Sequence, residues 1–556
     1  MSNASIKLID KNGQTLTTTA DANGAYQFND ISGMVRPLLL VAQGNLGGID
    51  TTFMSLLLSN GGNRANITPL TDAIVSQGTG HNGPTALVQS PSLLNAIDQS
   101  KVELSATNIA SSIANVLEAL RAGSSTNYSP LGTSFVADGS DPFDKVHDLL
   151  ATYVIPGIGS GGLDITLVDK SGTRGGAVIA NPLSTRQTTS VSALPSQITA
   201  LKFDKVKDFF ETFNTYTNSA STLTNPSGAF AALFDTNYAD YGQTKSQLLA
   251  ISPSPFLNTT LSNPVIQSCK TDGTCLVTFK QSFPNQSPTK GEFNLKWDNG
   301  QQKWTSIGHG SDDLIVDFDT YAQLDLSNPS HPIYTVLSFN IRNKANTLPF
   351  YTAEASFIAP NNTTDLTLNF ASDPNCESGL TNATLENGLP LQGATDCESW
   401  KFYTTTSDIN ALKQINQKIL AGGYTLKVRA NLKTNHATYV EMVKPLTQPF
   451  VTNDQVNESS FPQITVRAGS GSTLPSIEIA NYADFSTAGY TCFSTSNISC
   501  ANFGSDKLTE LTDNYTQLSS QNISPKSTDG WASNHAINSL VLTVRDRNNR
   551  KLRVVK

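Results

Sequence analysis

The first fifty residues alternate apolar and polar positions with the period of two that is typical of half-buried β-strands. Ile6 and Leu8 form one such pair, and Tyr26 and Phe28 form another. The turns "KNG" and "ANG" lie beside these pairs, and glycine supplies the positive backbone φ that tight turns between strands require. Residues 1–50 are therefore predicted to be a small β-domain.

Between residues 67 and 155 the period becomes that of short amphipathic helices. In "ITPLTDAIVSQ", Thr68 is the predicted N-cap and Pro69 takes the first helical position, a combination that favours helix initiation. Two further helices are predicted from apolar stripes, formed by Ile109, Ile113, Val116, Leu117 and Leu120 and by Phe143, Val146 and Leu150. The Gly-, Ser- and Thr-rich residues 161–198 are predicted to be a linker or an exposed β-excursion.

An α+β unit is predicted over residues 199–311. Its first helix is marked by a stripe of Phe203, Val206, Phe210 and Phe213. A second helix is predicted in "SGAFAALFDTNYADYG", followed by antiparallel strands that end in a hairpin. In that hairpin "DNG" turns between Trp297 and Trp304, which are expected to form a cross-strand pair.

From residue 312 to the end the pattern is β, with one helix. Ser407 is the predicted cap of that helix, and Ile409, Leu412 and Ile419 are predicted to point inward. A proline-containing stretch then divides a β-sandwich at 312–445 from a β-module at 446–556. The predicted segments are 1–50, 51–160, 161–198, 199–311, 312–445 and 446–556.

Three resemblances add to this interpretation. The residues "ASIKLIDKNGQTLTTTADANGAYQFNDI" resemble the carboxypeptidase regulatory-like domains, which are small transthyretin-like β-sandwiches. In that family an earlier strand usually precedes this point, so either the sequence begins after that strand or the edge receives a donor strand from another chain. The element order of 199–311 resembles the NTF2-like fold, and the whole order of parts resembles large, uncharacterised exported proteins of Gram-negative bacteria. The resemblances imply a mainly β, multidomain fold with transthyretin-like and Ig-like β-sandwiches, a small helical region and one NTF2-like unit.

Composition excludes some classes of partner. Only 15% of the 556 residues are charged, and the net charge of −8 comes from scattered acids, so nucleic acid is not expected as a partner. No apolar run approaches the roughly 20 residues that span a bilayer, so no membrane span is expected. The first 30 residues lack the features of a signal peptide.

The six cysteines form three close pairs, which predict disulfides in an oxidising compartment. The pairs are Cys269 with Cys275, Cys376 with Cys397, and Cys492 with Cys500. Metal binding or chance is the alternative, but no pair has the spacing of a zinc site with a nearby histidine. An extracellular or cell-surface location is therefore expected, with a secretion signal removed from the chain or left out of it.

No catalytic set is recognised, and the chain is predicted not to be an enzyme. The G-x-S-x-G motif is absent, and the six histidines lie in unrelated contexts, among which His309 in "GHGSDD" is the most suggestive. Acidic residues gather at Asp312, Asp313, Asp317 and Asp319. On a strand the last two point to one face about 7 Å apart, which suits a polar strand face, a calcium site or glycosidase chemistry. No cofactor other than calcium is expected.

Two surface features suggest partners. Trp531 lies in a polar loop and is a candidate for glycan contact by ring stacking. The C-terminal basic residues either meet an anionic polymer or an acidic patch of a neighbouring subunit, or protect an edge strand from unwanted pairing; they are Arg545, Arg547, Arg550, Lys551 and Arg553.

The leading hypothesis is an exported structural or assembly protein of the cell surface, such as a surface layer, matrix, filament or adhesin component. Its subunits would associate through β-edges, and envelope polysaccharide is a further expected partner. The alternatives are a glycan- or small-molecule-binding surface protein and a hydrolase of envelope polymers.

Overall fold

The computed structural model divides the chain into two compact units, which are described separately. Unit 1 comprises residues 1–235, 249–306 and 515–517, and unit 2 comprises 236–248, 307–514 and 518–556. The described residues are 1–59, 62–120, 128–156, 162–170, 177–179, 190–191, 201–218, 228–240, 243–250, 256–270, 272–284, 288–309, 314–343, 350–359, 361–371, 382–385, 392–396, 399–404, 412–416, 419, 424–432, 435–446, 450–452, 456–467, 476–480, 485–494, 522–523, 539–546 and 550–556.

Unit 1 begins with a four-stranded antiparallel sheet in the order β2-β1-β3-β4. Its strands are β1 (Ser5–Ile9), β2 (Thr15–Thr19), β3 (Leu38–Leu46) and β4 (Ile49–Leu57). The β1–β2 hairpin turns at the predicted "KNG", where Gly13 has a φ of 86°. The buried Asp10 carboxylate accepts the backbone N–H groups of Asn12, Gln14 and Val35, which closes this turn.

The prediction that Tyr26 and Phe28 lie on a strand is wrong. Their side chains instead pack on the sheet core, and the Tyr26 hydroxyl donates to the Ala65 carbonyl at 2.6 Å. Strand β1 pairs with β2 on one side and with β3 on the other. A donor strand from another chain therefore has no free β1 edge to join.

Helix α1 (Pro69–Thr79) closes the outer edge of β4. Thr68 caps it and Pro69 takes its first position, as predicted. Its buried side chains then bond to β4, because Asp72 Oδ1 accepts from Met54 N at 2.6 Å and Thr71 Oγ1 donates to Met54 O at 3.0 Å. Two polar backbone groups at this edge are thereby satisfied within the chain.

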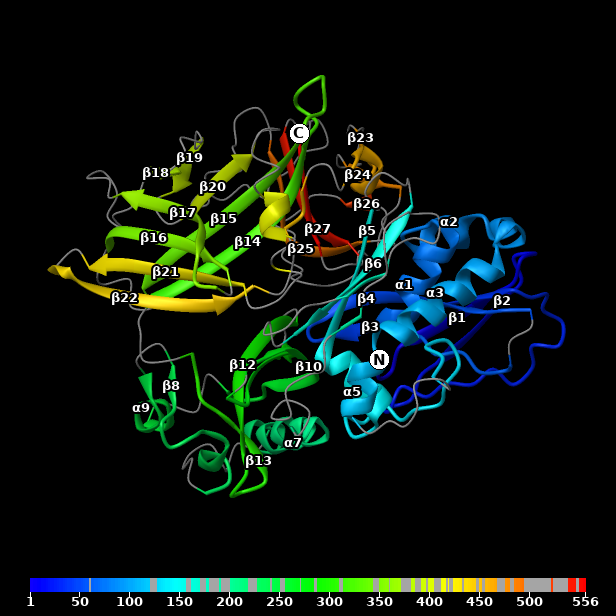
Figure 1. The fold of residues 1–556 in the computed structure, drawn as a ribbon, viewed down its shortest axis with the longest axis horizontal. Helices are drawn as coiled ribbons and strands as arrows, with labels where there is room; N and C mark the ends of the chain where they lie inside the picture. The colour runs from blue at the N-terminus through cyan, green and yellow to red at the C-terminus, as the bar shows by residue number, and fades with distance from the viewer. Residues whose placement is uncertain are drawn as a thin grey trace. The chain divides into compact units, whose positions relative to one another are not determined.

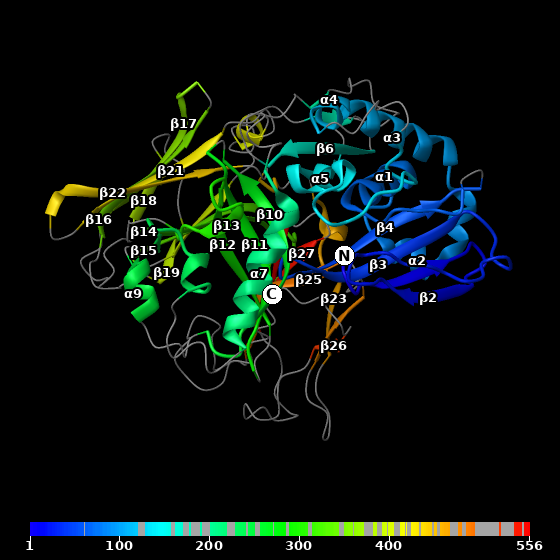
Figure 2. The same cartoon turned by 90° about the horizontal axis from the view of Figure 1, so that it is seen from below.

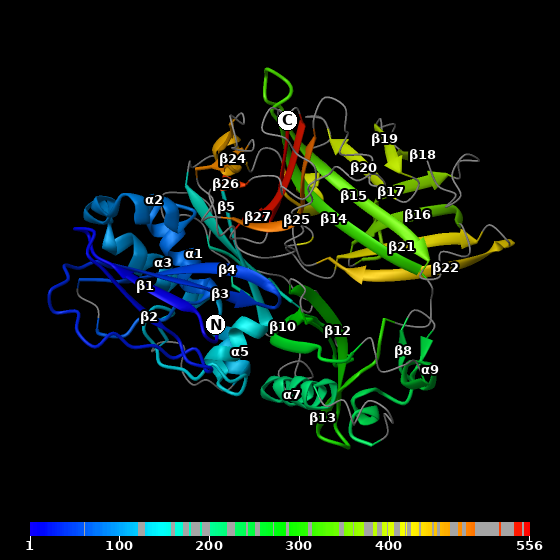
Figure 3. The same ribbon diagram turned by 180° about the vertical axis from the view of Figure 1, so that it is seen from behind.

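The other helices of the first half of unit 1 are short. They are α2 (Pro84–Gln89), the 3-10 helix η1 (Pro91–Ala96), α3 (Gln99–Ser112), α4 (Ala114–Ala119) and α5 (Pro142–Leu149). The stripe predicted as one helix is split at Ile113 into α3 and α4, yet Ile109, Ile113, Val116 and Leu117 are all buried. Helices α1 and α3 lie side by side over β3 and β4 (Figures 1 and 3).

Part of the stretch that was predicted to be a linker or an exposed excursion is a buried sheet. Strands β6 (Leu163–Asp169) and β7 (Ala177–Ile179) lie in that stretch and form the sheet with β5 (Leu150–Pro156), in the order β5-β6-β7. Strand β5 comes from the region predicted to be helical, so the expectation that Leu150 lies on a helix is wrong. Gln77 of α1 donates through Nε2 to the carbonyls of Leu163 and Ile179, each at 3.0 Å, and accepts from Ser105 Oγ of α3. A single amide thus joins α1 to this sheet and to α3.

The rest of unit 1 packs one helix on a third antiparallel sheet (Figure 2). The elements are η3 (Phe203–Lys205), α7 (Val206–Thr217), η4 (Ala231–Leu233), β10 (Thr260–Cys269), β11 (Thr274–Ser282), β12 (Thr289–Asp298) and β13 (Lys303–Ser306). Phe209, Phe210 and Phe213 of α7 form ring contacts with Phe279 and Phe293 of the sheet. Trp297 and Trp304 pair across the hairpin as predicted, with ring centroids 5.6 Å apart.

The second helix predicted for this region is absent from the described residues 228–240. In its place lie the 3-10 turn η4 and, in unit 2, the two-stranded pair β8 (Ala239–Asp240) and β9 (Gln243–Thr244), with helix α9 (Lys245–Ala250) beginning directly after β9. The NTF2-like interpretation of 199–311 stays a prediction.

Unit 2 contains two larger sheets (Figure 3). One has the order β19-β20-β15-β14-β28-β27-β25 and the other β18-β17-β16-β21-β22. Their strands are β14 (Leu314–Asp325), β15 (Ile333–Asn343), β16 (Phe350–Ile358), β17 (Thr364–Ala371), β18 (Asn382–Leu385), β19 (Gln392–Asp396), β20 (Ser399–Thr404), β21 (Thr425–Leu432), β22 (Asn435–Pro445), β25 (Phe485–Ser494), β27 (Ser539–Asp546) and β28 (Lys551–Val555). A small sheet contains β23 (Ile464–Arg467), β24 (Ser476–Ile479) and β26 (Asn522–Ile523), and the 3-10 turn η6 (Glu458–Ser460) precedes it.

One hydrophobic core joins residues of both large sheets of unit 2, including Phe339 of β15 and Phe357 of β16. Leu412 and Ile419 of the predicted helix are buried in it, as expected. Strand β14 pairs in parallel with β28, so the segments 312–445 and 446–556 share one sheet. The expectation of a mainly β chain is confirmed, and the sandwich assignments stay predictions.

Candidate functional site

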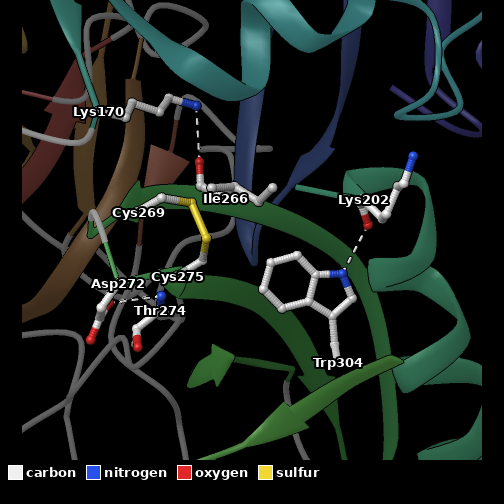
Figure 4. The surroundings of a disulfide bond; sticks show 8 residues. All are labelled: Lys170, Lys202, Ile266, Cys269, Asp272, Thr274, Cys275 and Trp304. Atoms are coloured by element: carbon white, nitrogen blue, oxygen red, sulfur yellow. Dashed lines mark hydrogen bonds between the residues drawn. A yellow bond between two sulfur atoms is a disulfide. The ribbon is translucent and has the colours of Figure 1, made fainter. Parts of the chain in front are cut away.

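One predicted disulfide is present in unit 1. Cys269 and Cys275 are bonded across the β10–β11 turn with their Cα atoms 4.0 Å apart (Figure 4). Asp272 shapes the turn by accepting the Thr274 N–H at 3.0 Å. Cys376, Cys397 and Cys500, and the side chain of Cys492, lie outside the described residues.

The predicted calcium site is described only at Asp319. Its carboxylate forms an ion pair with Lys551 of β28, so an ammonium group already lies beside one of the four expected ligands. Phe318 packs in the core on the opposite face of β14, as strand alternation requires. Asp312, Asp313 and the side chain of Asp317 lie outside the described residues, and among those described no cluster of three metal-ligating side chains occurs.

Several residues of the predicted basic patch contact groups of the same unit. The Arg550 guanidinium is largely buried and pairs with Asp546 at 2.7 Å. Arg553 donates to the Tyr321 hydroxyl at 3.2 Å and also lies over its ring. Arg545 is partly buried on β27, whereas Arg547 and Trp531 lie outside the described residues. The charge available to an external polyanion is correspondingly reduced.

His309 lies beside an acid in unit 2. Its Nδ1 is 2.7 Å from Oδ1 of Asp240, and both side chains are about one-quarter exposed. Gly308 permits this approach, because a Cβ at that position would lie 2.0 Å from the Ala239 carbonyl oxygen. A histidine oriented by a carboxylate is suited to proton transfer. The pair alone defines no reaction.

Unit 1 contains a pocket that is lined by described residues. We call it the leucine pocket; its volume is about 310 Å³ and its lining residues are Leu56, Leu57, Leu58, Gly62, Arg64, Glu103, Ala106, Thr107, Tyr128, Ser129, Leu131 and Gly132. This volume lies at the lower end of the range of small-molecule sites.

The apolar wall of the leucine pocket comes from the end of β4. Leu56, Leu57 and Leu58 are consecutive and all buried. Strand β4 ends at Leu57, so Leu58 continues past the sheet. The buried Ala106 of α3 adds a small apolar surface, which leaves open space where a larger side chain would fill it.

The opposite wall is presented by one face of α3. Glu103, Ala106 and Thr107 are three and four positions apart and therefore lie on the same side of the helix. Asp98 caps the helix by accepting the backbone N–H groups of Ser100 and Lys101. Gln99 then ties the start of α3 to the end of β4, because its side chain bonds to both the backbone N–H and the hydroxyl of Ser59.

Two sets of side-chain hydrogen bonds fix the loops at the rim of the leucine pocket. The Arg36 guanidinium donates to the carbonyls of Leu58 and Gly62 and to the Asn63 side chain. Asn66 donates from Nδ2 to the carbonyls of Pro130 and Thr133, and its backbone N–H bonds to Leu131. These bonds fix the two loops that carry Arg64 and Tyr128, so the site is preformed.

Tyr128 is a buried polar residue of this pocket. It is only 9% exposed, and its ring stacks on Phe143 of α5 with centroids 4.9 Å apart. Burial raises the pKa of its hydroxyl above the usual value, so the phenol stays protonated. Among the described residues, none forms a hydrogen bond with this hydroxyl, which is not one of the fully buried polar atoms that lack a partner.

A second polar cluster ties α5 to the sheets of unit 1. Lys170 Nζ donates to the His147 carbonyl at 2.8 Å. It also donates to the Ile266 carbonyl at 2.9 Å (Figure 4). It thereby occupies a carbonyl near the carboxyl end of α5, where a cation is favourable. This contact has a structural role.

The ionisable groups of that cluster are strongly perturbed. Burial, reinforced by the Asp148 carboxylate, raises the pKa of Asp144 to about 7. Burial raises the pKa of Asp148 to about 6 despite Lys170, and lowers the pKa of Lys170 to about 8. Burial and the Lys170 ammonium lower the pKa of His147 to about 3, so this histidine is neutral in the folded protein.

Comparison with protein-family models, with curated proteins and with solved structures finds no match for this chain. Within the described residues, no helix is long and apolar enough to cross a membrane.

Sequence patterns did not identify the leucine pocket. Its members come from positions 56–64, 103–107 and 128–132, and none belongs to a chemical motif. The only local signal is the leucine run in "FMSLLLS", which continues beyond the alternating part of β4. Arg64 and Tyr128 carry no signal, since they reach the site through tertiary contacts.

Proposed function

We propose that this is an exported, non-enzymatic binding protein that holds a small amphipathic molecule in the leucine pocket. One observation carries the proposal: a tyrosine buried to about nine-tenths lines the same pocket as a run of buried leucines. Its hydroxyl can donate and accept hydrogen bonds, and the leucines offer apolar surface. A ligand with a hydrogen-bonding end and an apolar body would match both.

The preformed walls support this assignment. The loops on both sides are fixed by side-chain bonds from Arg36, Asn66 and Gln99, so little ordering entropy would be lost when a ligand enters. The disulfide between Cys269 and Cys275 supports an extracellular location, because such bonds persist in oxidising compartments.

The test uses a plug and a matched control on the same helix. Thr107 lines the pocket and is exposed, so Thr107→Phe should fill the site without disturbing the core. Leu104 is 45% exposed and does not line the pocket, so Leu104→Phe adds a similar ring elsewhere on α3.

We expect titration calorimetry with octanoate and octan-1-ol to detect binding of at least one of them to the wild-type chain and to the Leu104→Phe variant. The Thr107→Phe variant should bind at least about tenfold more weakly. Equal affinity in all three proteins, or no binding of either compound to the wild type, contradicts the proposal.

Assembly through a β-edge is a second candidate function. Strand β22 is eleven residues long and lies at the edge of the five-stranded sheet, where Val443 is 49% exposed. A long edge strand is a template for pairing with another chain. Static light scattering of the full chain at increasing concentration tests this, and a constant monomer mass would rule it out. The glycan site at Trp531 and the acidic hydrolase site stay predictions.

A further inference from the structure

The rim of the leucine pocket carries a cation that has no acidic partner in the described part of the chain. Arg64 is exposed, and the contact found for its guanidinium is donation from Nη1 to the hydroxyl of Ser134, a neutral group. A guanidinium has five N–H donors in a planar fork. Its remaining donors match a carboxylate, which accepts two parallel N–H···O bonds.

Tyr128 adds a donor on the buried side of the same pocket. Its hydroxyl is protonated and can donate one hydrogen bond to an oxygen of the ligand. Tyrosine and arginine donors together favour an acceptor that carries negative charge, because charge-assisted hydrogen bonds are about twice as strong as neutral ones.

The other charged residues near the pocket limit the ligand's charge. Glu103 lines the α3 wall and has an interaction of its own, so it would repel a second negative group on the ligand. Arg36 reinforces the positive side, where it bonds to the carbonyls of Leu58 and Gly62. A single negative charge suits this arrangement better than two.

Volume and wall chemistry indicate the apolar part. A pocket of about 310 Å³ holds roughly ten groups of the size of a water molecule. Four leucines and an alanine supply its apolar surface, and in the part of the pocket that is described the only ring is that of Tyr128. An unbranched or lightly branched aliphatic body fits this wall.

We propose that the ligand of the leucine pocket is a medium-chain aliphatic monocarboxylate, with its acid group on Arg64 and Tyr128 and its hydrocarbon body against Leu56, Leu57 and Leu58. This inference rests on the proposed binding function and adds the ligand's charge. Arg64 sets the preference for an anion, and the leucines set the chain length.

The experiment compares three probes with the same hydrocarbon chain, namely octanoate, octan-1-ol and octylamine. Titration calorimetry on the full chain near neutral pH measures each affinity for the wild type and for Arg64→Gln, Tyr128→Phe and Glu103→Gln. Circular dichroism and the melting temperature show that each variant is folded. Arg64 and Glu103 are exposed, so their substitutions should leave the fold intact.

We expect octanoate to bind the wild type at least about tenfold more tightly than octan-1-ol, and octylamine more weakly than either. In Arg64→Gln, octanoate and octan-1-ol should bind with about equal affinity, and the affinity for octan-1-ol should be the same as in the wild type. Tyr128→Phe should weaken both oxygen-bearing probes, and Glu103→Gln should strengthen octanoate binding.

Two results overturn the inference in distinguishable ways. If octan-1-ol or octylamine binds as tightly as octanoate, the pocket binds ligands without selecting an anion, and the proposed binding function stands without this refinement. If none of the three probes binds the wild type, the binding function fails as well. An octanoate preference that persists in Arg64→Gln removes Arg64 from the site.

Discussion

The acidic cluster on α5 predicts an unusual pH dependence of stability in unit 1. The pKa of Asp144 is raised from 3.8 to about 7 in the folded protein, chiefly by burial. Between these two values the folded state therefore keeps a proton that the unfolded state releases. Since the unfolded state binds fewer protons, the free energy of unfolding falls as pH rises through this interval.

The size of this effect follows from the shift. One pKa unit corresponds to 1.36 kcal/mol, so the Asp144 carboxyl contributes at most about 4 kcal/mol to the change between pH 4 and pH 7. Solvent reaches the residue in part, and we expect about 2 kcal/mol. Asp148, with a pKa of about 6, acts in the same direction, whereas Lys170 is still largely protonated below its pKa of about 8.

The substitution Asp144→Asn removes the charge and keeps an acceptor for the Gly139 N–H, which Asp144 binds at 2.7 Å. Scanning calorimetry from about pH 5 to about pH 7.5 should show the unit 1 transition of the wild type falling with pH. In the variant the fall should be smaller, and at the upper pH the variant should melt about 4 °C higher, as about 2 kcal/mol implies.

A matched control is Asp208→Asn. Asp208 is half exposed on α7 and pairs with Lys205 at the surface, so its loss should change stability by less than about 1 kcal/mol at any pH. If Asp144→Asn leaves the pH profile unchanged, or steepens it, the reasoning from burial is wrong.

Two further substitutions test buried polar contacts. Asp72→Ala removes the acceptor of the Met54 N–H and should destabilise unit 1 by about 1 to 3 kcal/mol in urea unfolding. Asp72→Asn retains an acceptor and should destabilise it less. Equal losses of stability would contradict the hydrogen-bond account. Asp546→Ala leaves the Arg550 charge buried without its partner in unit 2 and should lower the free energy of unfolding by about 3 to 5 kcal/mol, measured in the same way. A loss of stability below about 1 kcal/mol would show that solvent compensates the arginine charge.

Local signals in the sequence predicted local structure. Thr68 and Pro69 marked the start of α1, and "DNG" marked the hairpin that pairs Trp297 with Trp304. The spacing of Cys269 and Cys275 was also sufficient, since the two lie on neighbouring strands of one turn. Each of these features depends on fewer than about ten consecutive residues, and for that reason periodicity and turn chemistry sufficed.

Features that join distant segments could not be predicted in this way. The β14–β28 pair connects residues 230 positions apart, and the Asp319–Lys551 contact connects residues 232 positions apart. No local pattern specifies such a partner. Tyr26 and Phe28 alternate like strand residues because both face the sheet core, yet their backbone does not join the sheet. The leucine pocket could not be predicted from the sequence for the same reason. It forms where Asn66 and Gln99 hold three separate segments of the chain together.

The contact of α1 with Met54 also bears on aggregation. Strand β4 is an outer strand of its sheet, and two backbone groups at its edge are occupied by Asp72 and Thr71 of that helix. If α1 detaches while the sheet persists, the exposed N–H and C=O groups of Met54 can pair with a strand of another chain. Aggregation of unit 1 on heating should therefore begin when one helix undocks, before the sheet itself unfolds. The helix covers the edge of β4, and the free energy with which it packs there determines how readily unit 1 aggregates.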